Sequence, residues 1–347
     1  MGVGVVNLAD LEYEKRFEGG LRFATEWGDI SRRMGGKKLG IGHWIVPPGK
    51  ASVPYHAHHV NEELVCVLGG EIRVRLKGEV YPLAAGDLVA LPPGPDSIHQ
   101  LLNYSDRPAN LILASTMIPR EVVDYPDSGK RGIGVAGLAG DTPMTRIMLR
   151  DGALLGPDPS TYFEGEPIDE PLGEPPEPPA ARDPRIVTIE GVPWERYEMG
   201  PFRADRKRLS RAAGGRLLGY SLYRLAPGDR SWPYHFQHVN EEFFFVRRGY
   251  GELRAPDGTR PLRPGDFVLC PPGPDGAHGI RSTGDSPLEV FALSTMEEPE
   301  ISEYPDSGKV YVMVGAAPGG DPTARTLDMV FRRADQVDYL DGEEQER

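Results

Sequence analysis

The segment Pro54-Tyr55-His56-Ala57-His58-His59-Val60-Asn61-Glu62-Glu63 occurs twice in this chain. Its second copy, Pro233-Tyr234-His235-Phe236-Gln237-His238-Val239-Asn240-Glu241-Glu242, begins 179 residues later and matches at eight of ten positions. The same shift relates the segment from Pro92 to His99 to the segment from Pro271 to His278. A period of this length is far longer than a solenoid repeat, so the sequence indicates a duplicated domain.

The length and the distribution of proline agree with two domains joined by a linker. The 347 residues are enough for about two domains of ordinary size. Between residues 156 and 185, nine of thirty residues are Pro and eight are Asp or Glu, which favours a solvated, semi-extended connection or a segment draped over the other domain. We therefore expect a first domain over residues 1–155, a linker over 156–185 and a second domain over 186–347.

Both halves have the pattern of short β-strands separated by turns. Residues 71–76 alternate apolar and charged side chains, as a half-buried strand does. Residues 64–68 and 243–246 are continuous apolar runs, which are typical of strands covered on both faces. Gly (43) and Pro (35) are both abundant, which favours many tight turns. The sequence therefore predicts an all-β chain of barrels or sandwiches.

Charge and composition exclude several kinds of partner and location. The net charge of −13 argues against nucleic acid and against anionic membranes as partners. Cys66 and Cys270 do not occupy equivalent positions in the repeat and lie in apolar runs, so we expect buried thiols and no disulfide framework. The sequence has neither a signal-like N-terminus nor an apolar run of 18 residues, and we expect a cytoplasmic protein.

Four side chains of the first half have the chemistry and the spacing of a metal site. His56 and His58 are two residues apart and so point to the same face of a strand. Glu63 follows after a short turn, and His99 comes from a distant strand. Three imidazoles and a carboxylate hold divalent first-row metals and leave positions open for water, oxygen or substrate. The alternative interpretation is that these are unrelated polar residues on strand surfaces.

The motifs around these residues resemble those of the cupin superfamily. The first motif reads Gly49, six residues, His56-Ala57-His58, four residues, Glu63, six residues, Gly70. The second reads Gly86, five residues, Pro92-Pro93-Gly94, four residues, His99, three residues, Asn103. The resemblance implies an all-β fold of two cupin-type double-stranded β-helix (jelly-roll) barrels in tandem. It also implies that His56, His58, Glu63 and His99 bind a divalent metal (Fe, Mn, Ni or Zn, with the identity left open).

The second half departs from this pattern at one ligand position. The corresponding set is His235, Gln237, Glu242 and His278, in which Gln237 replaces the second histidine. An amide oxygen is a neutral, weak ligand that favours harder metals than imidazole does. We expect a weaker metal site, a site for a different metal, or a water in its place.

Several other residues are candidates for the pocket or for support of the ligands. His59 and His238 match across the halves and fall on the face opposite the ligands, so each either holds a neighbouring loop or supports the site; a bulged strand would let His238 replace the missing ligand. Tyr55 precedes the ligands, and Asn103 ends the second motif. The repeated Tyr-Pro-Asp-Ser-Gly-Lys segment is a turn that closes the barrel, or it brings Tyr125 and Lys130 to a pocket mouth.

Two classes of function are compatible with these features. The first is a metal-dependent enzyme acting on a small phenolic or carboxylic compound, by dioxygenation if the metal is iron and by decarboxylation or isomerisation if it is Mn, Ni or Zn. The second is a non-catalytic protein that binds a small molecule inside the barrel. The expected partner is a small-molecule substrate or ligand, and the resemblance also allows a homo-oligomer.

Overall fold

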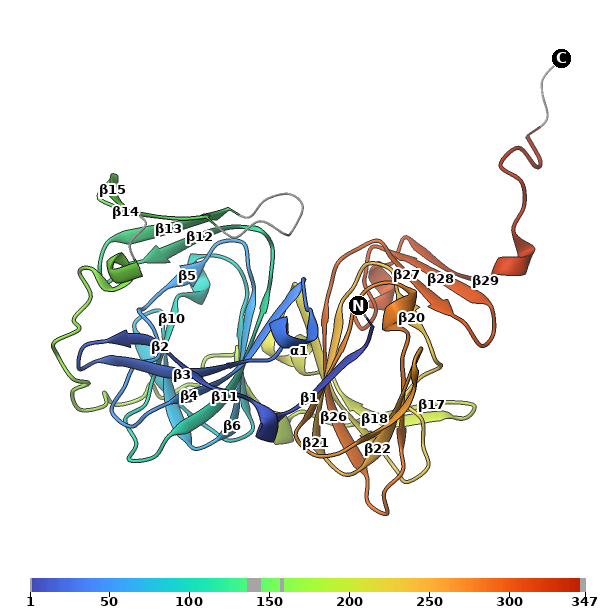
Figure 1. Ribbon diagram of the computed structural model, residues 1–347, viewed down its shortest axis with the longest axis horizontal. Coiled ribbons are helices and arrows are strands. Elements are labelled where there is room, and N and C mark those ends of the chain that lie inside the picture. Colours follow the sequence, from blue (N-terminus) through green and yellow to red (C-terminus); the bar gives the residue numbers. More distant parts are fainter. Residues whose placement is uncertain (1, 136–144, 157–158, 344–347) are drawn as a thin grey trace.

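The computed structural model describes residues 2–135, 145–156 and 159–343, and this part of the chain forms two β-barrels side by side (Figure 1). The expected all-β fold of tandem jelly-roll barrels is confirmed. Among the described residues, no helix has the length and apolar character needed to cross a membrane.

The first barrel is built from the strands that follow the N-terminal segment. They are β2 (Glu14–Gly19), β3 (Phe23–Asp29), β4 (Leu39–Val46), β5 (Ala57–His58), β6 (Glu63–Gly69), β7 (Glu71–Leu76), β8 (Glu79–Ala84), β9 (Asp87–Leu91), β10 (His99–Leu102), β11 (Ala109–Thr116), β12 (Arg120–Tyr125), β13 (Lys130–Val135), β14 (Thr145–Arg150), β15 (Ala153–Gly156) and β16 (Ile186–Thr188). One sheet has the order β16-β9-β6-β11-β4-β3-β2. The strand sets β10-β7-β8 and β15-β14-β13-β12-β5 complete the barrel.

The second barrel repeats this arrangement. Its strands are β1 (Gly4–Asn7), β17 (Glu195–Met199), β18 (Phe202–Lys207), β19 (Leu218–Leu225), β20 (Phe236–Gln237), β21 (Glu242–Arg248), β22 (Gly251–Ala255), β23 (Gly258–Leu262), β24 (Asp266–Cys270), β25 (Gly279–Ser282), β26 (Leu288–Thr295), β27 (Glu300–Tyr304), β28 (Lys309–Val314) and β29 (Leu327–Arg332). The large sheet has the order β1-β24-β21-β26-β19-β18-β17, and the sets β23-β22-β25 and β20-β27-β28-β29 complete the barrel.

Helical structure in the described residues is limited to short turns. The one α-helix there is α1 (Leu209–Ala213), and the 3-10 turns are η1 (Leu8–Asp10), η2 (Arg32–Met34), η3 (Pro95–Ser97), η4 (Pro159–Phe163), η5 (Ile189–Gly191), η6 (Pro274–Gly276), η7 (Pro322–Ala324) and η8 (Arg333–Asp335). The Pro-rich turns η3 and η6 occupy equivalent positions before His99 and His278.

Two strands cross the division predicted from the sequence. β1, from the start of the chain, pairs antiparallel with β24 of the second barrel. β16, which follows the linker, pairs antiparallel with β9 of the first barrel. Each barrel therefore adds its first strand to the edge of the other barrel's large sheet. This exchange covers two sheet edges and ties the barrels together through backbone hydrogen bonds.

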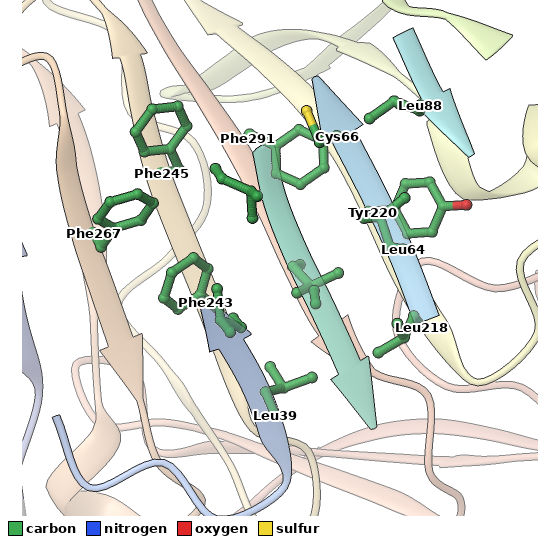
Figure 2. Packing of buried hydrophobic residues seen from close by; sticks show 14 of the residues in the cluster. Leu39, Leu64, Cys66, Leu88, Leu218, Tyr220, Phe243, Phe245, Phe267 and Phe291 are labelled. Atoms are coloured by element: carbon green, nitrogen blue, oxygen red, sulfur yellow. The ribbon is translucent and has the colours of Figure 1, made fainter. Parts of the chain in front are cut away.

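A shared apolar core lies between the two large sheets. Figure 2 shows this core, with Cys66 of the first barrel next to Phe291 and Leu64 next to Tyr220 of the second. The alternate residues of the same strands, such as Val65 and Phe244, point into the cores of their own barrels. This explains the two continuous apolar runs of the sequence, because one face of each strand lines a barrel and the other contacts the neighbouring barrel.

Two buried carboxylates link the barrels reciprocally. Glu62 accepts hydrogen bonds from the backbone N–H groups of Arg216 and Leu217 in the second barrel. Glu241, its counterpart in the repeat, accepts from the backbone N–H groups of Lys37, Lys38 and Leu39 in the first. The first Glu of the repeated Asn-Glu-Glu triplet is therefore an interface residue.

The predicted linker has two different parts. Beyond residue 170 it is mostly exposed, as its composition suggested, and residues 157–158 lie outside the described residues. The part around η4 packs on the first barrel, where Lys130 Nζ donates to the carbonyls of Tyr162 and Glu164 at 2.7 Å each and lies 3.2 Å from Glu166 Oε1. Burial of the Lys130 side chain against this segment gives the lysine a structural role rather than a place at an open pocket mouth.

Replacing Glu241 by Ala tests the reciprocal link. The change leaves the N–H groups of Lys37, Lys38 and Leu39 without their acceptor, and we expect the free energy of unfolding to fall by about 1–3 kcal/mol. Denaturant unfolding measures this loss. The control is Glu252→Ala, which removes only a partly exposed ion pair with Arg281 and should cost less than about 1 kcal/mol. Equal effects of the two changes would contradict the assignment.

Candidate metal centre

Three histidines and a glutamate converge inside the first barrel from separate strands. His58 lies on β5, Glu63 begins β6 and His99 begins β10. His56 and His99 form an antiparallel bridge in which each backbone N–H donates to the carbonyl of the other, at 3.0 and 2.8 Å. The backbone pairing of two segments distant in sequence therefore fixes the relative position of these two imidazoles.

Three of the four potential ligands form one group, and the fourth, His99, lies against the shared carboxylate of Glu63. The ligand atoms of His56, His58 and Glu63 all lie within 4.8 Å of one another. Glu63 oxygens lie 3.8 Å from His56 Nε2, 3.5 Å from His58 Nε2 and 3.2 Å from His99 Nε2. Two ligands at about 2.1 Å from a common ion and at right angles to each other are about 3 Å apart, so these separations suit one divalent metal.

The other nitrogen of each imidazole has a hydrogen-bond partner. His56 Nδ1 lies 2.9 Å from the Pro54 carbonyl, and His99 Nδ1 lies 3.0 Å from the Ser97 carbonyl. A carbonyl oxygen can only accept, so both Nδ1 atoms carry the proton and both Nε2 atoms direct a lone pair into the site. His58 Nδ1 lies 3.2 Å from Glu121 Oε2, which fixes the same tautomer. This is the tautomer required for metal ligation through Nε2.

Glu121 on β12 holds the turn that carries the ligands, and the motif analysis did not include it. Its carboxylate accepts from the backbone N–H groups of His59, Val60 and Asn61 and from the Asn61 side chain, in addition to His58. Burial alone would raise the pKa of Glu121, but the hydrogen bonds from His58 and Asn61 lower it to about 2. Glu300, which is 179 residues away, makes the same backbone contacts in the second barrel, and this match was the available sequence signal.

The charge balance favours an ionised Glu63 and a neutral His56 at the centre. Burial would raise the pKa of Glu63, but the neighbouring His58, His99 and His56 hold it well below its usual range. Burial, together with the neighbouring His99 and His58, lowers the pKa of His56 well below its ordinary value. These are the protonation states in which carboxylate and imidazole bind metals.

A cavity of about 760 Å³ opens beside these ligands. Its wall is mostly apolar, and its aromatic side chains come from four places in the chain: Phe17, Trp44, Tyr125, and Tyr162 with Phe163. The Phe17 ring stacks on Trp44 with centroids 5.6 Å apart and contacts Tyr162 at 5.5 Å. Phe17 has a positive φ of 58° at an irregularity in the pairing of β2 with β3, an unusual backbone for a bulky residue at a cavity wall.

The second barrel has a related but different cluster. The ligand atoms of His235, Glu242 and His278 lie within 4.8 Å of one another, with His278 Nε2 at 3.4 Å from Glu242 Oε2. The Gln237 side chain forms a hydrogen bond with Glu242. Gln237 Oε1 and His278 Nε2 are both buried and have no hydrogen-bond partner. Burial and the nearby Glu300 raise the pKa of Glu242 to about 8, so this carboxyl is protonated at neutral pH where Glu63 is ionised.

The cavity of the second barrel is much smaller, at about 170 Å³. Trp232 occupies the repeat position of Val53, and its indole stacks on Phe244 with centroids 5.5 Å apart. Tyr311 and Met313 stand where the first barrel has Gly132 and Gly134 on the cavity wall. Trp232 lines this smaller cavity, so a larger side chain at the position of Val53 takes up part of the space that is open in the first barrel.

The remaining candidate residues from the sequence support the fold around the site. His59 Nε2 lies 2.7 Å from Asp124, and His238 Nε2 lies 2.8 Å from Glu303, so each histidine holds the neighbouring strand. The hypothesis that His238 replaces the ligand missing at Gln237 is wrong, because this pair directs it to β27. The Tyr55 hydroxyl accepts a hydrogen bond from the Gly78 N–H, and the Asn103 side-chain amide donates to the carbonyls of Val46 and Arg107. Both side chains therefore bind backbone groups of the first barrel.

The repeated Tyr-Pro-Asp-Ser-Gly-Lys segment forms a turn in both barrels. Asp127 accepts two hydrogen bonds from Arg75, and Asp306 accepts two from Arg254. These bonds hold each turn against the facing strand of its own barrel. Tyr125 does reach the cavity, where its ring stacks on His56 with centroids 6.0 Å apart. The turn is therefore structural, and of its residues Tyr125 contributes to the site.

Two jelly-roll barrels, each with a His/Glu cluster inside, define a two-domain cupin architecture. The Cupin domain family model matches residues 42–115 and 221–294, once in each barrel. Protein SchB of Streptomyces halstedii is 35% identical over 127 residues, which cover 36% of this chain and 85% of SchB. The chain belongs to the cupin family and contains two cupin domains.

Solved structures share this fold over most of the chain. A formate complex of oxalate decarboxylase from Lactobacillus farciminis matches with a TM-score of 0.51 and 17% identity, over 84% of this chain and 85% of that one. Protein Ylba of E. coli matches with a TM-score of 0.51 and 12% identity, over 85% and 90% of the two chains. At these identities the likeness concerns the fold alone.

Glu121→Gln tests how the ligand histidine is oriented. An amide in this place no longer offers two carboxylate oxygens to His58 and the turn, and we expect divalent metal to bind about 10- to 100-fold more weakly at the first site. Metal titration of the purified protein measures the change. The matched control is Glu300→Gln, which alters the same backbone contacts beside Gln237 and has no ligand histidine to orient. An equal loss of first-site affinity in both variants would contradict a specific role for Glu121.

Glu242→Gln tests the protonated carboxyl of the second barrel in metal-free protein. The folded-state pKa of about 8 exceeds the ordinary value of 4.5, so the stability contribution of this group is present at low pH and is lost as the pH rises toward 8. As the pH rises through this window, we expect the free energy of unfolding of the variant to increase relative to that of the natural protein by up to about 1.4 kcal/mol per pH unit. Urea unfolding at about pH 5, 6 and 7 measures the difference, in which contributions of His235 and His278 largely cancel. Parallel stability curves would show that the pKa is not raised.

Proposed function

We propose that the chain is a metal-dependent enzyme whose first barrel oxygenates a neutral phenolic compound. One divalent ion, with iron as the metal that suits this reaction, would be held by His56, His58, Glu63 and His99. The observation that carries the proposal is an apolar, aromatic-walled cavity of about 760 Å³ that opens directly on the ligand group of His56, His58 and Glu63, with His99 Nε2 3.2 Å from Glu63.

The residues present fit such an ion. All three Nδ1 atoms are engaged by backbone carbonyls or by Glu121, which leaves the three Nε2 atoms to face the ionised carboxylate of Glu63. Bound iron would supply the one-electron chemistry by which a closed-shell phenol can react with dioxygen. The chain's own contribution is to orient the ligands and to exclude water from the apolar cavity.

The cavity lining favours an uncharged aromatic substrate over a carboxylate. None of the described residues that line it is Lys or Arg, and Glu18 at its wall would repel an anion. Phe17, Trp44 and Tyr162 offer ring faces and edges for stacking, which suits a planar ring system. This balance weighs against decarboxylation of a small acid, the reaction in the name of the Lactobacillus farciminis neighbour.

The second barrel is assigned a supporting role. Its cavity of about 170 Å³ is too small for an aromatic substrate, and its cluster has an amide and a protonated carboxyl in place of a histidine and a carboxylate. A weakly held metal there would contribute to stability rather than to turnover. A non-catalytic binding protein is the second candidate, since the same cavity would also retain an aromatic ligand without reaction.

Val53→Trp separates substrate binding from metal binding. The change copies Trp232 into the first barrel, where we expect the indole to fill the cavity, abolish binding of phenolic ligands and leave metal bound at the first site. Metal content, calorimetric binding of a panel of phenols and oxygen consumption by the iron-loaded protein are the readouts. Val53→Ile is the control, because it retains an open cavity.

Three results would contradict parts of this proposal. Protein reconstituted with iron, manganese or zinc that holds no metal would remove the enzymatic proposal altogether. Phenol binding that survives Val53→Trp would place the substrate elsewhere. Phenol binding without oxygen consumption in iron-loaded protein would favour the binding protein.

A further inference from the structure

Exposed apolar side chains gather at the C-terminal end of the second barrel. Among the described residues, seven of the fifteen large apolar side chains that are exposed lie between residues 327 and 340: Leu327, Met329, Val330, Phe331, Val337, Tyr339 and Leu340. Four of them are on β29, a strand on which every residue is exposed. Figure 1 shows β29 at the outer rim of this barrel, with the following segment leading away from both barrels. An apolar patch of this kind marks a contact surface.

The internal repeat shows what this strand lacks. In the first barrel the equivalent strand, β14, pairs with β15 on its outer side, which gives a five-stranded set. In the second barrel the set ends at β29, and no strand in the described part of the chain pairs with its outer edge. An apolar strand with an open edge is a ready template for pairing with another strand.

The backbone groups on the open edge can be identified. The N–H of Arg333 donates to the Gly308 carbonyl, and the register pairs Phe331 with Val310 and Met329 with Val312. Hydrogen-bonded positions alternate along an antiparallel pair, so the N–H and C=O groups of Asp328, Val330 and Arg332 point away from β28. These three residues offer six groups to a neighbouring strand.

The charges of β29 are complementary to a second copy of itself. Asp328 and Arg332 lie two residues on either side of Val330. Antiparallel pairing of two β29 strands about Val330 places Asp328 of each copy opposite Arg332 of the other, and Met329 opposite Phe331. Arg332 has no ion pair among the described residues. Asp328, whose side chain is partly exposed, forms an ion pair with Arg325 at 3.2 Å. Opposite charges directly across a strand pair stabilise it.

We propose that β29 is a homodimer interface, in which it pairs with β29 of a second copy across a two-fold axis at Val330. The pairing joins two four-stranded sets into one sheet of eight. It satisfies the six outward backbone groups of each strand and brings Met329 of each copy next to Phe331 of the other. The partner is thus a second copy of this chain, and the site in the first barrel is unaffected.

Charge reversal tests this register with the full-length protein. We expect the natural protein to sediment as a dimer, and we expect Asp328→Arg and Arg332→Asp each to raise the dimer dissociation constant about tenfold or more, because each puts like charges opposite one another twice in the dimer. The double variant D328R/R332D restores opposite charges in the same register and should restore the dimer. Thermal unfolding of each variant checks that the fold is retained.

The outcomes separate this interface from others. Sedimentation of the natural protein as a monomer would overturn the proposal, and so would a dimer that both single changes leave intact. Failure of the double variant to recover would rule out pairing about Val330. Tyr339→Ala serves as the control outside the strand, and a dimer lost only in that variant would place the contact in the C-terminal segment instead.

Discussion

The arrangement of the site and of the interface depends on one buried carboxylate in each barrel, which holds the turn before the repeated Asn-Glu-Glu triplet. Glu121 in the first barrel and Glu300 in the second each accept several backbone N–H groups from the turn that begins the Asn-Glu-Glu triplet. Because the turn is held in place, the three side chains of the triplet make different contacts in the first barrel. Asn61 forms hydrogen bonds with Glu121 and with Thr116 of β11, Glu62 contacts the other barrel, and Glu63 lies in the site. Alternation along an extended chain gives the last two their opposite directions.

The two barrels therefore form one structural unit rather than two domains on a tether. Their largest apolar core lies between them, and their first strands are exchanged. In addition, Glu62 and Glu241 each accept hydrogen bonds from backbone N–H groups in a loop of the other barrel. This gives a reason for both barrels to persist when only one has a complete ligand set. Loss of the second barrel would expose the apolar face of β6 and leave the first barrel's site on a destabilised scaffold.

The repeats differ inside the barrels, where the site and the cavity lie. Gln237, Trp232 and Tyr311 replace His58, Val53 and Gly132, while the carboxylates that hold the turn (Glu121 and Glu300) and those that cross the interface (Glu62 and Glu241) are the same in both repeats. The first barrel is thereby hollow and carries an ionised glutamate, and the second is filled and carries a protonated one. Shape and charge differ together because added aromatic bulk and a lost imidazole both lower the polarity around Glu242.

The sequence by itself determined the duplication, the all-β barrels and the candidate ligands, because strand periodicity and ligand spacing are local properties that survive in a linear pattern. Tertiary structure alone decided which strands are exchanged, that Lys130 secures the η4 segment, and that Glu121 orients His58. It also decided that His238 serves Glu303 rather than the site. These depend on pairings between residues about 30 or more positions apart, or on which barrel a strand edge meets, and no local pattern encodes them.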